Sequence, residues 1–319
     1  MSDAGDNVDG GETHFDRTLS LTLPGVDARG RLVRLGPVLD TILSAHQYPP
    51  AAERVLAEAL VLAALLGATL KDDASQITLQ AQTENGPIRL LVADYRAGQL
   101  RGYLDFDAEK LTEAGVDPSL FALFGNGYLA ITLDQGPVAG SDGTRYQGIV
   151  PLEGHGLADA AQTYFRQSEQ LPTFARIAVA HVAGQGCVAG GVLMQQLAAG
   201  EVGRERISVR DEHLGPDARW QHVETLASTL SHDELTDGTL SLEALAWRLF
   251  HDDGDILVEQ GPLLTRGCRC DAGHLQAVVA RFPADERADM VGDDGMIGID
   301  CAFCSRHFAI DPAALCPPS

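Results

Sequence analysis

Four of the six cysteines in the 319-residue sequence form two close pairs near its C-terminal end. Cys268 and Cys270 are separated by one residue, and 30 residues further on Cys301 and Cys304 are separated by two. Four thiolates are the complete ligand set of a closed tetrahedral zinc site, and two short turns can each present two sulfurs to one ion at about 2.3 Å. The spacing therefore predicts one Zn²⁺ per chain, bound by these four cysteines.

The second pair, taken alone, also has the spacing of a thioredoxin-like redox motif. In that motif the first cysteine opens a helix, whose dipole lowers the pKa of the thiol. The segments "GMIGID" before Cys301 and "RHFAID" after Cys304 predict strands instead, which is typical of a zinc-knuckle hairpin. Spacing alone favours a purely structural zinc site over a reactive one. His274 or His307 could replace one sulfur, but the four thiols already complete the ligand set.

Several basic side chains lie near the cysteines in a chain that is otherwise strongly acidic. They are Arg266, Arg269, His274, Arg306 and His307. Positive charge stabilises a thiolate and so increases its reactive fraction. The same charges would equally offset the negative charge of an ion bound by four thiolates, so the sequence leaves both roles open.

The composition excludes several classes of protein. With 45% hydrophobic and 21% charged residues, the chain is globular rather than disordered. Its net charge of −22 disfavours nucleic acid and anionic membranes as partners. The N-terminus lacks the features of a signal peptide, and the most apolar segment, Ala59–Leu70, is too short to span a bilayer. We therefore expect a cytoplasmic protein, in which clustered cysteines serve metal or redox chemistry.

The two remaining cysteines stand apart from the pairs. Cys187 lies in an apolar segment and is expected to be a small buried hydrophobic residue. Cys316 belongs to the terminal "CPPS" and is expected to be exposed and incidental.

Helical and strand patterns alternate over the first 200 residues and predict an α+β fold. Residues 30–36 predict a strand, a helix follows from Pro37, and residues 51–67 predict a second, fully buried helix. Residues 76–106 alternate as an antiparallel meander of three strands. Further strands are expected at 127–134, 144–152, 173–182 and 187–197, with a helix at 157–170.

The pattern becomes helical beyond a polar hinge near residue 200. Residues 219–230 and 241–251 predict two short amphipathic helices, which need a partner surface. We expect an acidic disordered tail (1–16), an N-terminal mixed α/β domain with the meander (17–199), a helical linker (200–262), a small zinc-binding domain (263–312) and a tail (313–319). Permanent docking of the linker helices on a neighbouring domain is the simplest expectation for them.

The cysteine arrangement resembles the redox-switch domain of the 33 kDa heat-shock protein family, the 33 kDa chaperonins. Four other segments are similar to that family's pattern and occur in the expected order, so the resemblance covers about residues 29–312. They are "RYQGIVPLEG", "YFRQSEQLPT", "AGGVLMQQL" and "LAWRLFHDD". The chain departs from the family at Gly267, where an aromatic residue is usual, and at "DAGH", where a Ser-Arg-Glu-Arg-like run is usual.

The resemblance implies a redox-regulated, ATP-independent holdase of the stress response and not an enzyme. Oxidation would form Cys268–Cys270 and Cys301–Cys304 disulfides, release zinc and unfold the C-terminal domain and linker. Residues 17–199 would be the chaperone and dimerisation domain, active as a homodimer. Apolar linker residues would then bind unfolding client proteins and prevent their aggregation: Trp220, Val223, Leu226, Leu230, Leu245, Leu249 and Phe250.

A different class of function remains open from the residues themselves. An enzyme of unknown chemistry with a structural zinc ribbon at its C-terminal end would carry the same cysteines. Zinc release coupled to a gain of aggregation suppression would distinguish the switch from the ribbon.

Overall fold

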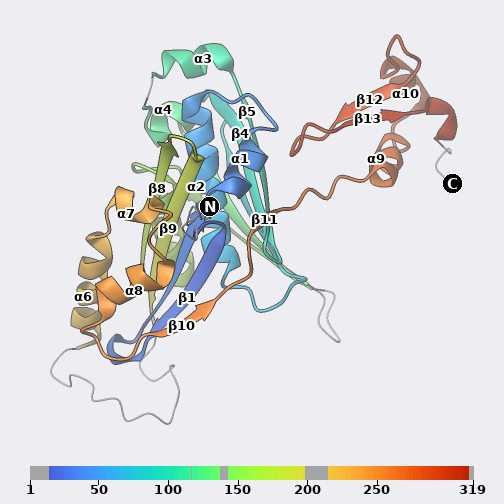
Figure 1. Cartoon of the computed structure of the whole chain (residues 1–319). Coiled ribbons are helices and arrows are strands. Elements are labelled where there is room, and N and C mark those ends of the chain that lie inside the picture. Colours follow the sequence, from blue (N-terminus) through green and yellow to red (C-terminus); the bar gives the residue numbers. More distant parts are fainter. Residues whose placement is uncertain (1–13, 116, 137–142, 198–214, 316–319) are drawn as a thin grey trace, which may run out of the picture.

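Two sheets, antiparallel except for one short pair of strands, face each other across one buried helix (Figure 1). The computed structural model describes residues 14–115, 117–136, 143–197 and 215–315. The first sheet has the strand order β10-β1-β2-β9-β8. Its strands are β1 (Arg17–Leu23), β2 (Ala28–Leu35), β8 (Thr173–Val182), β9 (Gly186–Gln196) and β10 (Leu257–Gln260).

The second sheet has the order β11-β5-β4-β3-β6-β7 and contains the predicted meander. Its strands are β3 (Gln76–Gln82), β4 (Ile88–Arg96), β5 (Gln99–Phe106), β6 (Tyr128–Gln135), β7 (Thr144–Pro151) and β11 (Thr265–Arg266). Every pair is antiparallel except that of β11 with β5. The predicted α+β class and the meander are confirmed.

Helix α2 (Pro50–Gly67) fills the space between the sheets. Fourteen of its 18 residues are buried, because leucine, valine and alanine occupy all of its faces. Pro50 stands at its first position, where no intrahelical N–H is lost. The predicted buried helix is therefore confirmed. Among the described residues, none of the helices combines the length and the apolar composition needed to span a bilayer.

Shorter helices complete the N-terminal part. They are α1 (Pro37–Leu43), α3 (Ala108–Glu113), α4 (Leu120–Phe124) and α5 (Leu157–Tyr164), with a 3-10 turn at Pro24–Val26. A π turn, Phe165–Glu169, ends the helix predicted at 157–170, and Gln170 after it has a φ of 53°. The predicted helix is therefore α-helical only up to Tyr164.

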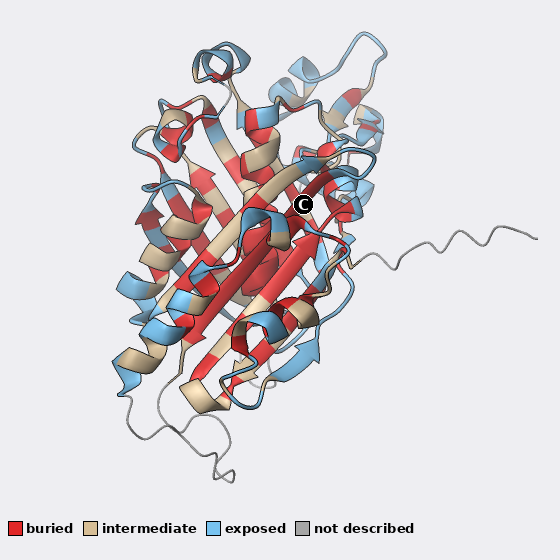
Figure 2. Ribbon diagram, turned by 60° about the vertical axis from the view of Figure 1, so that its left-hand side comes forward, coloured by how far each residue is buried: buried red, intermediate tan, exposed pale blue. Residues whose placement is uncertain are grey.

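Both faces of the five-stranded sheet are covered. The side chains along each strand point alternately to one face and to the other. On β2, Val33 and Leu35 pack toward α2, whereas Leu32 and Arg34 point to the opposite face. Helices α6 (Pro216–Ser228), α7 (His232–Thr236) and α8 (Leu242–Phe250) cover that opposite face. Buried residues follow the central strands, while the outward surfaces of the helices are exposed (Figure 2).

The linker region is not wholly helical. Strand β10 pairs with β1, Leu19 opposite Gln260 and Thr22 opposite Leu257, and was not predicted. Strand β1 itself was also not predicted, although Leu19, Leu21 and Leu23 alternate in its sequence. Helices α3 and α4 and strand β11 are further unpredicted elements.

The expected N-terminal tail lies outside the described residues except for its last three. Of these, Phe15 is buried, and Asp16 accepts hydrogen bonds from the backbone N–H groups of Gly36 and Val38 at the start of α1. Cys316 and the hinge at 198–214 also lie outside the described residues.

A small C-terminal unit follows β11 and projects from one side of the body (Figure 1). It contains α9 (Ala272–Val279), α10 (Ala284–Asp289), the hairpin of β12 (Ile297–Asp300) and β13 (His307–Ile310), and a 3-10 turn at Pro312–Ala314. Its core cluster of described residues has four buried members: Val279, Ile297, Ile310 and Leu315. A core this small is weak support for an independent fold.

Candidate metal centre

The four paired cysteines lie together in one cluster. All four sulfurs are within 4.8 Å of one another, with Cys268 Sγ 3.6 Å from Cys301 Sγ and Cys270 Sγ 3.5 Å from Cys304 Sγ. A tetrahedral zinc ion with Zn–S bonds of about 2.3 Å would place its sulfurs about 3.8 Å apart. The donor set and its spacing therefore fit one tetrahedral metal ion, and no histidine belongs to the cluster among the described residues.

A hairpin turn presents the second pair. Cys301 follows β12, and its N–H donates to the carbonyl oxygen of Arg306 at 3.0 Å. The N–H groups of Cys304 and Ser305 both donate to the carbonyl oxygen of Cys301, and Ser305 turns the chain with a φ of 54°. Cys301 opens no helix, so the thioredoxin-like geometry weighed above is absent here. We call residues 301–305 the knuckle.

The first pair is fixed to the edge of the six-stranded sheet. Strand β11 pairs with β5, and the Gly267 N–H donates to the carbonyl oxygen of Leu100 at 2.9 Å. A Cβ atom on residue 267 would lie 2.4 Å from the Cβ of Gln99. A larger residue at this position would push the segment away from β5, so the glycine lets the first cysteine pair lie close to this strand.

The thiols differ in their acidity. Burial raises the pKa of Cys268 to about 12 and also raises the pKa of Cys270. Burial acts in the same direction on Cys304, but the N–H of Arg306 and the three neighbouring thiols outweigh it and lower the pKa of Cys304 to about 7. Among these three thiols, Cys304 is therefore the most acidic in the folded arrangement of the cluster.

Cys187 lies apart from the cysteine cluster. It is buried in the core between the sheets, and burial raises its pKa to about 12. The expectation of a small buried hydrophobic residue is confirmed.

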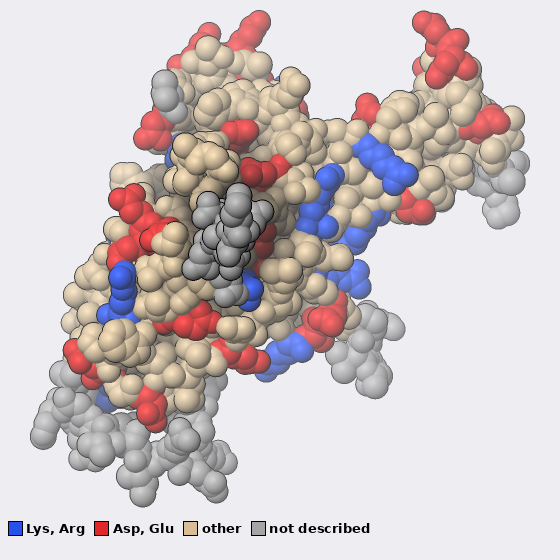
Figure 3. Space-filling model, in the orientation of Figure 1, with Lys and Arg blue, Asp and Glu red and all other residues tan. Residues whose placement is uncertain are grey.

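The basic residues near the cysteines have individual partners. His307 Nδ1 lies 2.8 Å from Asp300 Oδ1, and Arg269 Nη1 donates to Gln76 Oε1 at 2.5 Å. Lys and Arg side chains gather where the C-terminal unit meets the body (Figure 3). Arg269 faces the positive charge of Arg101 as well as the sulfur of Cys268. The surroundings of the thiols are thus more positive than the rest of this acidic protein.

The seven linker residues named from the sequence lie away from the cysteine cluster, on the outer face of the five-stranded sheet. Val223, Leu230, Leu245 and Phe250 are buried in one cluster with residues of β1, β2, β8 and β9. The other three are partly buried against the same cluster: Trp220, Leu226 and Leu249. The apolar faces of the linker helices are therefore covered in this conformation.

Two arginines that the sequence reasoning missed hold these helices. Arg34 of β2 is fully buried, and its guanidinium donates to the carbonyl oxygens of Glu234, Leu235 and Leu240. Arg176 of β8 donates to the carbonyl oxygens at the end of α6 and just after it, those of Ser228 and Leu230. The local pattern of β2 gives no signal for Arg34, because the face on which it lies is covered only by helices about 200 residues further along the chain.

Glycine makes the close approach of α7 possible. A Cβ on Gly190 of β9 would lie 2.0 Å from the carbonyl oxygen of Leu235, and one on Gly191 would lie 2.6 Å from a side-chain atom of Val61. The two glycines therefore let α7 and α2 approach opposite faces of the same strand.

Comparison with known proteins agrees with the resemblance. The family model described as Hsp33 protein matches residues 16–311. A 33 kDa chaperonin of Caulobacter vibrioides (strain NA1000 / CB15N) is 41% identical over 304 residues, covering 93% of this chain and 95% of that protein. A 33 kDa chaperonin of Yersinia pestis (strain Pestoides F) is 35% identical over 283 residues, covering 89% and 88%.

A solved structure has the same fold. The crystal structure of a 33 kDa chaperonin, a heat shock protein 33 homolog from Thermotoga maritima, superposes with a TM-score of 0.74 at 23% identity, covering 94% of this chain and 96% of that one. Since the family model and these relatives span almost all of the sequence, the chain belongs to the Hsp33 family.

Proposed function

We propose that this protein is a redox-regulated, ATP-independent holdase chaperone. The main support for the proposal is the apolar surface of α6 and α8, which is buried against the five-stranded sheet. The same segment of the chain continues through β10 and β11 into the cysteine cluster. The names of the relatives, 33 kDa chaperonins, support a chaperone rather than an enzyme. Its partners would be unfolding polypeptides, and it would act in the cytoplasm as a homodimer.

In the reduced state the four cysteines would bind one Zn²⁺. Zinc bound to four thiolates supplies roughly 10–16 kcal/mol of apparent binding free energy, which is also folding free energy. Whole domains are stable by only about 5–15 kcal/mol. Because the core cluster of the C-terminal unit has only four buried members among the described residues, this metal would decide whether the unit is folded.

Oxidation would remove the ligands. Each disulfide forms when two thiolate sulfurs give up two electrons, which reduce the O–O bond of one hydrogen peroxide molecule. Two protons from solvent complete two water molecules. Cys268 would bond Cys270 and Cys301 would bond Cys304, and the four sulfurs would no longer be available as thiolates to the metal.

Unfolding of the C-terminal unit would then release the linker helices from the five-stranded sheet. Strand β10 is exposed along its whole length, and β11 consists of two residues, so both are weak attachments once the unit beyond them unfolds. The seven apolar residues of α6, of α8 and of the turn after α6 would leave the sheet. Burying one such side chain again, against a client protein, is worth about 1.5–3 kcal/mol.

The proposal is tested by measuring zinc content and suppression of client aggregation on the same sample, before and after treatment with peroxide. We expect one zinc per chain and little suppression at first, then loss of zinc together with a gain of suppression, both reversed by a thiol reductant and zinc. A Cys187→Ser variant is the matched control, because Cys187 is a buried cysteine outside the cluster. Retained zinc, or suppression that does not change, would exclude the switch.

A further inference from the structure

One of the two residues between the cysteines of the second pair, Phe303, contacts the body of the protein. Phe303 packs edge-on against Tyr103 of β5, with ring centroids 4.8 Å apart and an interplanar angle of 80°. The guanidinium carbon of Arg101, also on β5, lies 4.0 Å from the centroid of the Phe303 ring. Phe303 thus has an aromatic partner and a cationic partner on one strand, both in favourable geometries.

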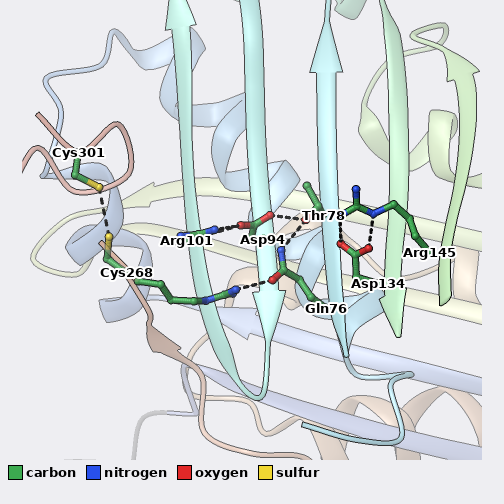
Figure 4. A network of polar contacts seen from close by, with 9 residues as sticks. Gln76, Thr78, Asp94, Arg101, Asp134, Arg145, Cys268 and Cys301 are labelled. Atoms are coloured by element: carbon green, nitrogen blue, oxygen red, sulfur yellow. Dashed lines mark hydrogen bonds and ion pairs between the residues drawn. The ribbon is translucent and has the colours of Figure 1, made fainter. Parts of the chain in front are cut away.

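The cation in this contact is held in place independently of Phe303. Arg101 Nε and Nη2 both lie 2.7 Å from Asp94 Oδ2, and the Asp94 side chain is only 3% exposed. Asp94 also accepts a hydrogen bond from the hydroxyl of Thr78 at 2.7 Å (Figure 4). The chain of contacts from Thr78 to Arg101 therefore fixes the guanidinium at the position where Phe303 meets it.

A second contact lies beside the first. Ser305 Oγ is 3.1 Å from His46 Nδ1, and the His46 ring stacks on Tyr48 with centroids 5.0 Å apart. His46 belongs to the loop after α1, so the knuckle touches two separate segments of the N-terminal part. We call the receiving surface, made of Arg101, Tyr103 and His46, the knuckle dock.

The conformation in which the knuckle contacts the dock is also the one that presents Cys301 and Cys304 to the other two cysteines. Phe303 stands between Cys301 and Cys304, and the hydrogen bonds of Cys304 and Ser305 to the Cys301 carbonyl shape a single turn. A turn that presents both sulfurs inward therefore presents Phe303 to β5. Because binding at two sites that require the same conformation is reciprocal, each contact must strengthen the other.

We infer that the knuckle dock, on β5 and the loop after α1, is an interaction surface that fastens residues 302–305 to the N-terminal part and thereby slows metal release from the four cysteines. The six-stranded sheet is then part of the metal-release step and not only a scaffold. The inference rests on the proposed metal binding but does not depend on chaperone activity.

The test measures zinc release from the reduced, zinc-loaded full chain into a chromophoric chelator, without oxidant. Tyr103→Ala changes the dock alone, Phe303→Ala changes the knuckle alone, and a third variant carries both substitutions. Loss of one contact of this kind should speed release by about 5- to 30-fold. The double variant should be no faster than the faster single variant, because the two residues share one contact.

A matched control is Tyr128→Ala, which removes a tyrosine from β6 of the same sheet at a site 39% exposed and away from the knuckle. Its release rate should equal that of the wild type. Amide exchange provides a second readout: Tyr103→Ala should increase exchange at residues 302–305 while leaving α6–α8 of the zinc-loaded protein protected.

Two results would overturn the inference. One is wild-type release in both single variants, and the other is additive acceleration in the double variant. If the wild type binds zinc and gains aggregation suppression on oxidation while the variants release zinc at its rate, the dock is wrong and the proposed function stands. If the wild type binds no zinc, both are wrong.

Discussion

Arg34 Nε donates a hydrogen bond to the carbonyl oxygen of Leu235 at 3.0 Å, across 201 residues of sequence. The strand residue belongs to the N-terminal sheet, and its acceptor lies in α7 of the linker. Burial lowers the pKa of Arg34 to about 10, which still leaves the guanidinium charged at neutral pH. The buried guanidinium of Arg34 therefore connects the linker helices to the N-terminal sheet on which they pack.

Replacing Arg34 by methionine should loosen the linker without oxidation. The substitution keeps the apolar stem but leaves three carbonyl oxygens without their donor, which we expect to cost roughly 2–5 kcal/mol. The reduced, zinc-loaded Arg34→Met protein should bind an apolar dye and lose amide protection in α6–α8. Arg89→Met, which removes an exposed arginine paired with Asp105, is the control and should do neither.

Replacing Gly190 by alanine should also loosen the linker helices, because the added methyl group clashes with α7. The Cβ of Gly190→Ala would meet the carbonyl oxygen of Leu235, a backbone atom that cannot move unless α7 moves. We expect a loss of about 1–3 kcal/mol in the stability of the docked linker, seen as earlier exchange of α7 in a denaturant series. Gly215→Ala, where a Cβ would meet nothing within 4 Å, should leave that exchange unchanged. Equal exchange in the two variants would contradict the packing described here.

The disulfides formed by peroxide should join each cysteine to its sequence neighbour. In the structure Cys268 lies 3.6 Å from Cys301 and Cys270 lies 3.5 Å from Cys304, so bonds across the pairs are sterically possible while the cluster is closed. Once the metal leaves, only the covalent chain keeps any two sulfurs close, which favours Cys268–Cys270 and Cys301–Cys304. Peptide mapping of the oxidised protein under non-reducing conditions distinguishes these products from a Cys268–Cys301 cross-link.

The elements with a simple period were predictable from the sequence. The buried helix α2, the meander and the hairpin around the second cysteine pair follow from local patterns, and the cysteine spacing predicted which four cysteines lie together. Strand β10 was not predictable because all four of its residues are exposed, so it has no inward face to alternate with an outward one. Strand β11 is two residues long and exists because it pairs with β5.

Contacts between distant segments could not be predicted from local patterns. Arg34 looks like a surface residue until the opposite face of its strand is known to be covered by helices. In the sequence Phe303 is only a residue between two cysteines, and its contact with Arg101 becomes visible once β5 lies beside it. Both roles depend on tertiary neighbours about 200 residues away, and no local propensity reports such neighbours.

The most direct test of the account is amide hydrogen exchange of α6–α8 followed together with zinc content while peroxide is added. The account predicts that protection at buried positions such as Val223, Leu245 and Phe250 is lost in proportion to the zinc released, and returns when a reductant and zinc are restored. Complete loss of zinc with α6–α8 still protected would contradict it.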